Sequence, residues 1–213
     1  MAGSACWRPE LDGPPPLPSV AAMSRRRLSP LARMAMQVAG QLQPDAPACR
    51  CVFGSRHGEI RSTAAMLAAL AEEQPLSPAA FSHSVHNALP GLWSILQGQT
   101  GETSAVAAGR DTLPMALLEA QGMLAYDPRT PVLVIVADET LPPEFAAFAD
   151  EPGEPYALGL LLESGNPNLR LHALSERGDA CRDPVLAWQS WWLGESATLC
   201  LAGENMAWQW ERV

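Results

Sequence analysis

The chain has 213 residues, enough for one α/β domain with at most a short appendage. Its net charge is −9, and nucleic-acid binders need clustered Lys and Arg to neutralise phosphates, so we expect no nucleic-acid partner. All 14 basic residues are arginine. The lack of lysine excludes Schiff-base, pyridoxal-phosphate and P-loop lysine chemistry. We expect no cofactor, and we expect the partner to be a protein.

The cysteines and the apolar runs suggest the compartment. Five cysteines occur at spacings that resemble no disulfide framework, and the first residues lack the apolar core of a secretory leader. The longest strand-like apolar run, residues 132–137, is too short to cross a membrane. We therefore expect a cytoplasmic protein with reduced thiols and no membrane span.

The N-terminal part predicts an arm followed by a helix. Residues 1–22 are rich in Pro and Gly, which favours an extended arm over a helix. Apolar residues then recur with helical spacing over residues 28–39. Ser29 and Pro30 suit the N-cap and the first turn of this helix.

The middle of the chain alternates short apolar runs with longer helical patterns, which is typical of an α/β fold with a largely parallel sheet. Ser77 and Pro78 suit a capped turn between two of the helices. We expect strands at residues 48–54, 103–107 and 131–137, and helices at 60–73, 92–97 and 112–126. The helix at 60–73 is expected to pack through Ala65, Leu67, Ala68, Leu70 and Ala71.

The C-terminal part predicts strands and a tryptophan-rich region. Residues 157–163 and 168–174 could pair as a hairpin across residues 165–167. A further strand is expected at 199–202. Five of the seven tryptophans lie in this tail, at positions 188, 191, 192, 208 and 210. They could form an exposed cluster or pack as a satellite core.

Soft ligands for zinc occur at Cys49, Cys51 and His57, with His83 and His86 further along. However, the two cysteines of a Cys-x-Cys strand point to one face, and cysteine is among the most buried residue types. We therefore expect buried thiols and no metal site. None of the cysteines begins a predicted helix, where the helix dipole would lower the thiol pKa, so we expect no cysteine nucleophile.

Several segments together resemble the N-terminal half of the ketosynthase, or thiolase-like, superfamily. Residues 24–36 are similar to its first helix, residues 52–58 to the following strand and turn, and residues 84–91 to a stretch with a Ser-Val-His-Asn element. Residues 92–137 are similar to its nucleophile turn and surrounding elements. The resemblance implies half of a thiolase-like fold at residues 23–165, with helices on the faces of a largely parallel sheet. It leaves a tryptophan-rich extension at 166–213 unmatched.

The resemblance also implies that this chain is not an enzyme by itself. An active ketosynthase has a cysteine at the turn between strand and helix, where Ala108 or Gly109 stands here. Neither residue can form a thioester. The family's second half, with two catalytic histidines and a lysine, has no counterpart, and His172 is the only histidine after the matching core.

Short relatives without the nucleophile resemble chain-length-factor subunits of aryl polyene pigment biosynthesis. This implies a heterodimer with a full-length ketosynthase that extends a chain held on an acyl carrier protein. The strand before the degenerate turn is the expected interface, and the tail tryptophans are a second candidate. The interface residues are Thr103, Ser104, Ala105, Val106 and Ala107.

The sequence leaves alternatives open for two groups of residues and for the function. Ser84, His86 and Asn87 form a structural loop or line an acyl tunnel. Arg25, Arg26 and Arg27 are a solvated helix start or a dock for the carrier protein. The rival functions are a stand-alone acyltransferase or thioesterase, which would use His83 or His86 with Ser82 or Ser84, and a scaffold that makes no contact with the acyl chain.

Overall fold

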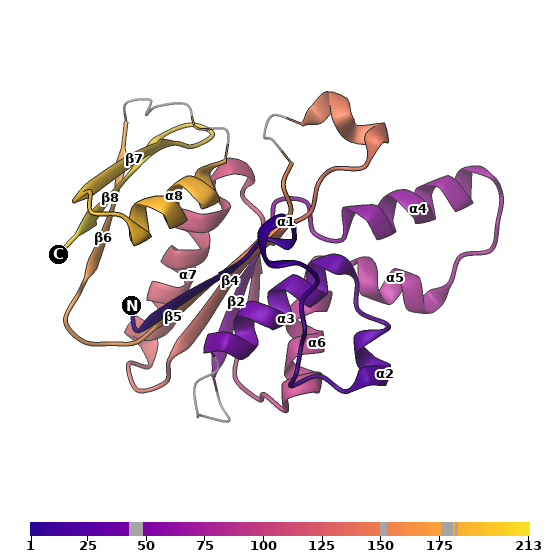
Figure 1. Ribbon diagram of the computed structural model, residues 1–213, viewed down its shortest axis with the longest axis horizontal. Helices are drawn as coiled ribbons and strands as arrows, with labels where there is room; N and C mark the ends of the chain where they lie inside the picture. Colours follow the sequence, from indigo (N-terminus) through magenta and orange to yellow (C-terminus); the bar gives the residue numbers. More distant parts are fainter. Residues whose placement is uncertain (43–48, 150–152, 176–180, 182) are drawn as a thin grey trace.

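The computed structural model describes residues 1–42, 49–149, 153–175, 181 and 183–213. A five-stranded sheet with the order β1-β5-β4-β2-β3 forms its centre (Figure 1). Only β5 runs against the other strands, which confirms the predicted α/β fold with a largely parallel sheet. The strands are β1 (Gly3–Trp7), β2 (Arg50–Gly54), β3 (Thr103–Val106), β4 (Val132–Asp138) and β5 (Tyr156–Leu162).

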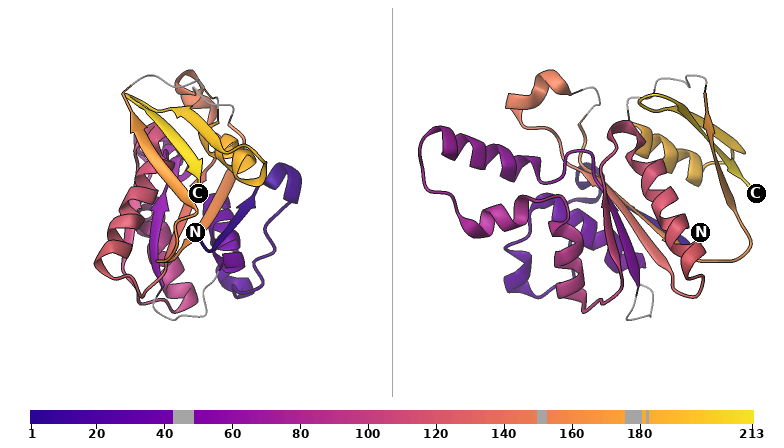
Figure 2. Two further views of the ribbon diagram at one scale, coloured as in Figure 1. Left: turned by 90° about the vertical axis from the view of Figure 1, so that its left-hand side faces the viewer. Right: turned by 180° about the vertical axis from the view of Figure 1, so that it is seen from behind.

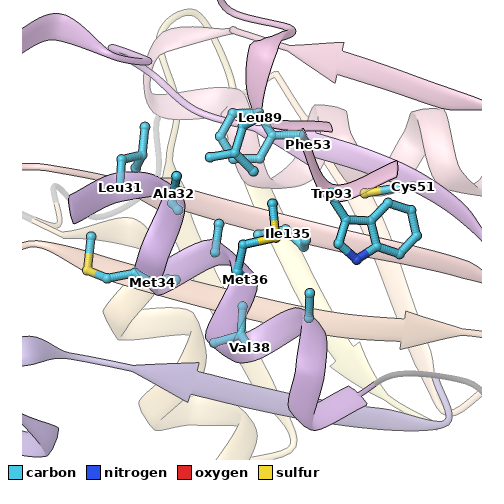
Figure 3. Packing of buried hydrophobic residues seen from close by; sticks show 14 of the residues in the cluster. Leu31, Ala32, Met34, Met36, Val38, Cys51, Phe53, Leu89, Trp93 and Ile135 are labelled. Atoms are coloured by element: carbon cyan, nitrogen blue, oxygen red, sulfur yellow. The ribbon is translucent and has the colours of Figure 1, made fainter. Parts of the chain in front are cut away.

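Helices cover both faces of this sheet because its side chains alternate between them. Cys51 and Phe53 of β2 point to one face, where α3 (Pro30–Leu42) and α6 (Ala88–Gln97) pack (Figure 3). Val52 points to the other face, which α7 (Thr112–Tyr126) covers. The predicted bounds of α7 are confirmed.

The start of α3 follows the predicted capping pattern. The hydroxyl oxygen of Ser29 accepts a hydrogen bond of 3.0 Å from the Ala32 N–H, and Pro30 begins the helix. Leu31, Met36 and Val38 then point into the core beside Ile135 of β4 and Trp93 of α6 (Figure 3). Local pattern and tertiary packing therefore agree for this helix.

The predicted N-terminal arm is extended in part, but it is not a free arm. Gly3–Trp7 pairs antiparallel with β5, so that Gly3 lies opposite Leu161. Without this pairing β5 would leave its backbone groups exposed at the edge of the sheet. Two short helices follow: α1 (Pro9–Asp12), where the sequence pattern predicted extended chain, and α2 (Ala22–Arg25), which begins at the end of the predicted arm.

Helix α4 (Ile60–Ala71) and helix α5 (Pro78–Ser84) form a hairpin that projects away from the sheet (Figure 1). The predicted cap is confirmed, since the Ser77 hydroxyl oxygen accepts from the Ala80 N–H. The predicted packing of α4 is wrong, because none of its residues is buried and Leu67 and Leu70 are 54% and 59% exposed. An apolar pattern shows that a helix has a face to cover, but not whether its own chain covers it.

The tail lies at the opposite end of the molecule from this hairpin (Figure 2). Its strands form a second sheet in the order β6-β8-β7, which packs with α8 on α7. The predicted hairpin of β5 with β6 is wrong, because β4 and β1 already occupy both edges of β5. The tail elements are β6 (Leu169–Leu174), α8 (Pro184–Leu193), β7 (Thr198–Ala202) and β8 (Ala207–Arg212).

Of the two alternatives for the tail tryptophans, the structure shows the satellite core and not the exposed cluster. Trp188 and Trp210 are buried, with ring centroids 5.7 Å apart, and Trp192 stacks on Trp188. These side chains cover the outer face of α7, which would otherwise be exposed.

The described residues also include two 3₁₀ helices, η1 (Gly109–Asp111) and η2 (Pro143–Phe148). Among the described residues, no helix is both long and apolar enough to span a bilayer.

Candidate functional site

The turn between β3 and α7 is held by its own polar groups. The Ala108 N–H donates to Oγ1 of Thr112 at 3.1 Å, and the Asp111 N–H donates to the Ala108 carbonyl at 2.9 Å. The Thr112 hydroxyl donates to the Gly109 carbonyl at 2.7 Å. Gly109 has φ of +56°, the left-handed region that glycine adopts without steric cost. Ala108 and Gly109, which stand at the expected nucleophile position, have no reactive side chain.

The tail lies directly on this turn. Oε1 of Glu204, between β7 and β8, accepts a hydrogen bond of 2.9 Å from the Arg110 N–H. In return, Asp111 accepts from the Glu204 N–H at 3.3 Å and from Nε1 of Trp208 at 2.8 Å. Sequence reasoning missed this contact, because Asp111 and Glu204 are far apart in the chain and belong to no motif.

Strand β3 forms one edge of the main sheet, where β2 is its neighbour among the described strands. The carbonyls of Glu102 and Val106 accept from the N–H groups of Cys51 and Ser55 at 2.9 and 3.1 Å. The N–H and C=O of one residue in a parallel strand point the same way, and the direction alternates along the strand. Alternate residues therefore present both backbone groups to the free edge. Within β3 these are Thr103 and Ala105, while Ser104 and Val106 face β2. Ala107 directly follows the strand and would be next in the alternation.

The polar loop after α5 is anchored to the core. Nε2 of His86 lies 2.9 Å from the carbonyl oxygen of Ser55, so the ring nitrogen must be the donor. The His86 ring also packs against Phe53, with centroids 5.9 Å apart. Ser84 ends α5, and Asn87 is exposed at the start of α6. These contacts favour the structural interpretation of the loop.

The serines of the rival enzyme hypothesis donate their protons to backbone groups. The Ser82 hydroxyl donates to the Pro78 carbonyl at 3.0 Å, and the Ser84 hydroxyl donates to the Phe81 carbonyl at 2.8 Å. His83 is exposed at the end of α5. A serine nucleophile needs its proton directed at a base, which this geometry does not provide.

The three arginines lie at the end of α2. Arg25 donates to the carbonyl of Pro16 at 2.8 Å, whereas Arg26 and Arg27 are exposed. Two of the three charges are therefore accessible to a partner, and the third holds the preceding chain.

Cys51 of β2 and Cys49, which directly precedes this strand, are both buried in the same hydrophobic cluster, which confirms the expected buried thiols. Burial raises the pKa of Cys49 to about 11, and it raises the pKa of Cys51 as well. Within the described part of the chain, no three His, Cys, Asp or Glu side chains gather as metal ligands would.

A buried carboxylate at the end of β4 was not predicted. Asp138 accepts from the Ser55 hydroxyl at 2.8 Å, from the Arg56 and His57 N–H groups at 3.0 Å each, and from the Tyr156 hydroxyl at 3.3 Å. Burial raises its pKa, and these hydrogen bonds to the N–H and Ser55 groups oppose the rise. The side chain borders a cavity of about 170 Å³ and fixes the loop after β2. An Asp directly after a buried strand is the signal that could have indicated it.

The chain matches a family model described as the N-terminal domain of beta-ketoacyl synthase over residues 3–211. It belongs to this family. The match includes the first strand and the tail, so the relationship to the beta-ketoacyl synthase N-terminal domain extends well beyond residues 23–165, to which the sequence resemblance was assigned. No curated protein matches the chain at a significant level.

Solved structures of ketosynthase-like proteins share this fold. A chain from the complex of the ketosynthase ApeO with its chain length factor ApeC, from Xenorhabdus doucetiae, is 29% identical with a TM-score of 0.81. The alignment covers 91% of this chain and 82% of that chain. The ishigamide ketosynthase/chain length factor is 18% identical (TM-score 0.54; 78% and 53% covered). A beta-ketoacyl synthase from Burkholderia phymatum is 14% identical (TM-score 0.54; 68% and 44% covered). These last two show similarity of fold alone.

Proposed function

We propose that this chain is a non-catalytic, chain-length-factor-like partner of a full-length β-ketoacyl-acyl carrier protein synthase. The observation that carries the proposal is the match to a chain of the ApeO–ApeC complex. Because 91% of one chain aligns with 82% of the other, the two have similar lengths. The residues at the degenerate turn support a non-catalytic role, since Ala108 and Gly109 lack a nucleophile.

The proposed contact with the synthase is the free edge of β3. Unpaired N–H and C=O groups accept an added strand readily, and Thr103, Ala105 and Ala107 present such groups. Exposed apolar side chains continue beside this edge, because α6 packs against β3 and α5 packs against α6. Ile95 of α6 is 79% exposed and Phe81 of α5 is 62% exposed. A synthase that extended the sheet could cover these residues too.

The finer assignments form part of the same proposal. We infer that the complex acts in the cytoplasm on chains held by an acyl carrier protein, in fatty-acid-like or aryl polyene biosynthesis. Arg26 and Arg27 are the proposed contact for the acidic carrier protein, since both are exposed. We assign the loop of Ser84, His86 and Asn87 a structural role beside α6 rather than a catalytic role.

Strand addition at β3 can be tested by co-expression with a full-length ketosynthase from the same source, followed by size-exclusion chromatography. Ala105→Pro removes an outward N–H and should lower the yield of co-purified synthase at least tenfold. Ala105→Ser keeps this N–H and serves as the matched control, which should bind as the unmodified chain does. A monodisperse monomer that ignores the synthase would contradict the proposal. A complex that tolerates Ala105→Pro would place the interface elsewhere.

A further inference from the structure

The contact between the β7–β8 turn and the turn after β3 is reciprocal. Each turn supplies a carboxylate to the backbone of the other, Glu204 to the Arg110 N–H and Asp111 to the Glu204 N–H. Asp111 is 7% exposed and also holds the indole of Trp208. Hydrogen bonds to ionised groups are roughly twice as strong as neutral ones, and this applies best to the buried Asp111, whereas Glu204 is exposed.

Two glycines permit the approach. A Cβ atom on Gly109 would lie 2.3 Å from Oε1 of Glu204, and a Cβ atom on Gly203 would lie 1.8 Å from Oδ1 of Asp111. Both distances are far below van der Waals contact. Glycine at the degenerate turn therefore does more than lack a nucleophile, because it also makes room for a carboxylate from the tail.

Three N–H donors of the turn, those of Ala108, Arg110 and Asp111, are committed to acceptors within the chain. Thr112 Oγ1 takes the Ala108 N–H, Glu204 takes the Arg110 N–H, and the Ala108 carbonyl takes the Asp111 N–H. A bound thioester needs such donors at the place where its oxygen gains charge. A carboxylate held there would instead repel both an oxyanion and a thiolate.

We propose that the β7–β8 turn is a built-in plug of the degenerate turn, which prevents this chain from holding an acyl group even where a thiol is restored. The growing chain is then left to the partner subunit. This last point rests on the proposed function, whereas the plug is a property of the chain alone.

The test restores a thiol and then removes the plug. Purified Ala108→Cys, Ala108→Cys/Glu204→Ala and Ala108→Cys/Asn205→Ala variants are incubated with hexanoyl-N-acetylcysteamine. In the acylation step, the introduced thiolate attacks the thioester carbonyl and forms a new C–S bond. The old C–S bond breaks, and N-acetylcysteamine leaves as a thiolate that takes up a proton. Mass spectrometry of the modified peptide measures the rate and separates this thiol from the native cysteines.

We expect acylation at least tenfold faster with Glu204→Ala than in Ala108→Cys alone, and no acceleration with Asn205→Ala, a change at the neighbouring exposed position. Equal rates with and without Glu204, whether fast or slow, would overturn the plug. A second measurement needs no introduced thiol. Amide hydrogen exchange at Arg110 should accelerate at least tenfold in Glu204→Ala while the Ser55 amide is unchanged, and an unchanged Arg110 rate would also overturn the proposal. Neither measurement depends on a synthase, so failure to form a complex would leave the result intact.

Discussion

Burial raises the pKa of two carboxylates that lie near the start of α3, Glu59 and Glu139. Glu59 accepts a hydrogen bond of 2.5 Å from the Ser29 hydroxyl. Burial raises the pKa of Glu59, the Ser29 hydrogen bond opposes the rise, and the Glu139 carboxylate adds to it. Glu139 accepts from the Leu31 N–H at 2.6 Å and pairs with Arg61 at 2.9 Å. Burial raises the pKa of Glu139 as well.

A raised carboxylate pKa makes folding stability depend on pH. The folded state holds the proton of Glu59 more tightly than the unfolded state, so this contribution to stability is lost as pH rises from about 4.3 through the folded pKa. Glu59→Gln keeps an acceptor for Ser29 and removes the ionisation. We therefore expect the variant to gain stability relative to the unmodified chain as pH rises from 4 to 7. Urea unfolding across this range checks the sign, and a pH-independent difference would contradict it.

Among the elements, those with a clear local pattern of apolar residues could be predicted from the sequence. The periodic apolar residues and the Ser29 cap indicated α3, and the bounds of α7 followed from its pattern. Helix α4 was also found, but its face was assigned to the core because periodicity contains no information about which surface covers it. The degenerate turn was located, whereas the Glu204 contact was not, because local sequence does not specify which distant turn lies on it.

Substitutions on the projecting hairpin of α4 and α5 should affect folding and assembly differently. Leu67→Ser and Leu70→Ser together should change the free energy of unfolding by less than about 1 kcal/mol, because both side chains are largely exposed. If the synthase covers this face, the same double variant should lower the yield of complex several-fold. Leu193→Ser, at a 72% exposed position of α8, is the control and should leave the yield unchanged. Equal yields from all three proteins would exclude the hairpin from the interface.

For the whole molecule, the order of strands depends on contacts that no local pattern contains. β1 pairs with β5 across most of the chain, and the tail covers α7 although sequence resemblance had left it unmatched. The tail therefore completes the core of the same unit. Its tryptophans were recognised as bulky anchors, but only the packing on α7 shows that they stabilise the chain itself.

A substitution of Trp188, which lies among the other tail tryptophans, can measure how much the tail stabilises the chain. Trp188 is fully buried against Trp191, Trp192 and Trp210. Trp188→Ala should lower the free energy of unfolding by about 3–5 kcal/mol, since a large cavity would form in the core. Trp188→Phe retains an aromatic ring and should cost clearly less. Chemical denaturation followed by tryptophan fluorescence measures both, and a cost below about 1 kcal/mol for the alanine variant would show that the tail is energetically independent.

The pairing of the first strand with β5 has a consequence for synthesis on the ribosome. Gly3 and Leu161 lie opposite each other in the sheet, but Leu161 is made 158 residues after Gly3. At about 5–20 residues per second, the first strand waits on the order of 10–30 s for that partner. The outer face of α7 also lacks its cover at that point, because the tail that packs on it comes later in the chain. The nascent chain therefore carries an unpaired first strand until β5 has been made, and its yield should depend on chaperones that shield this strand.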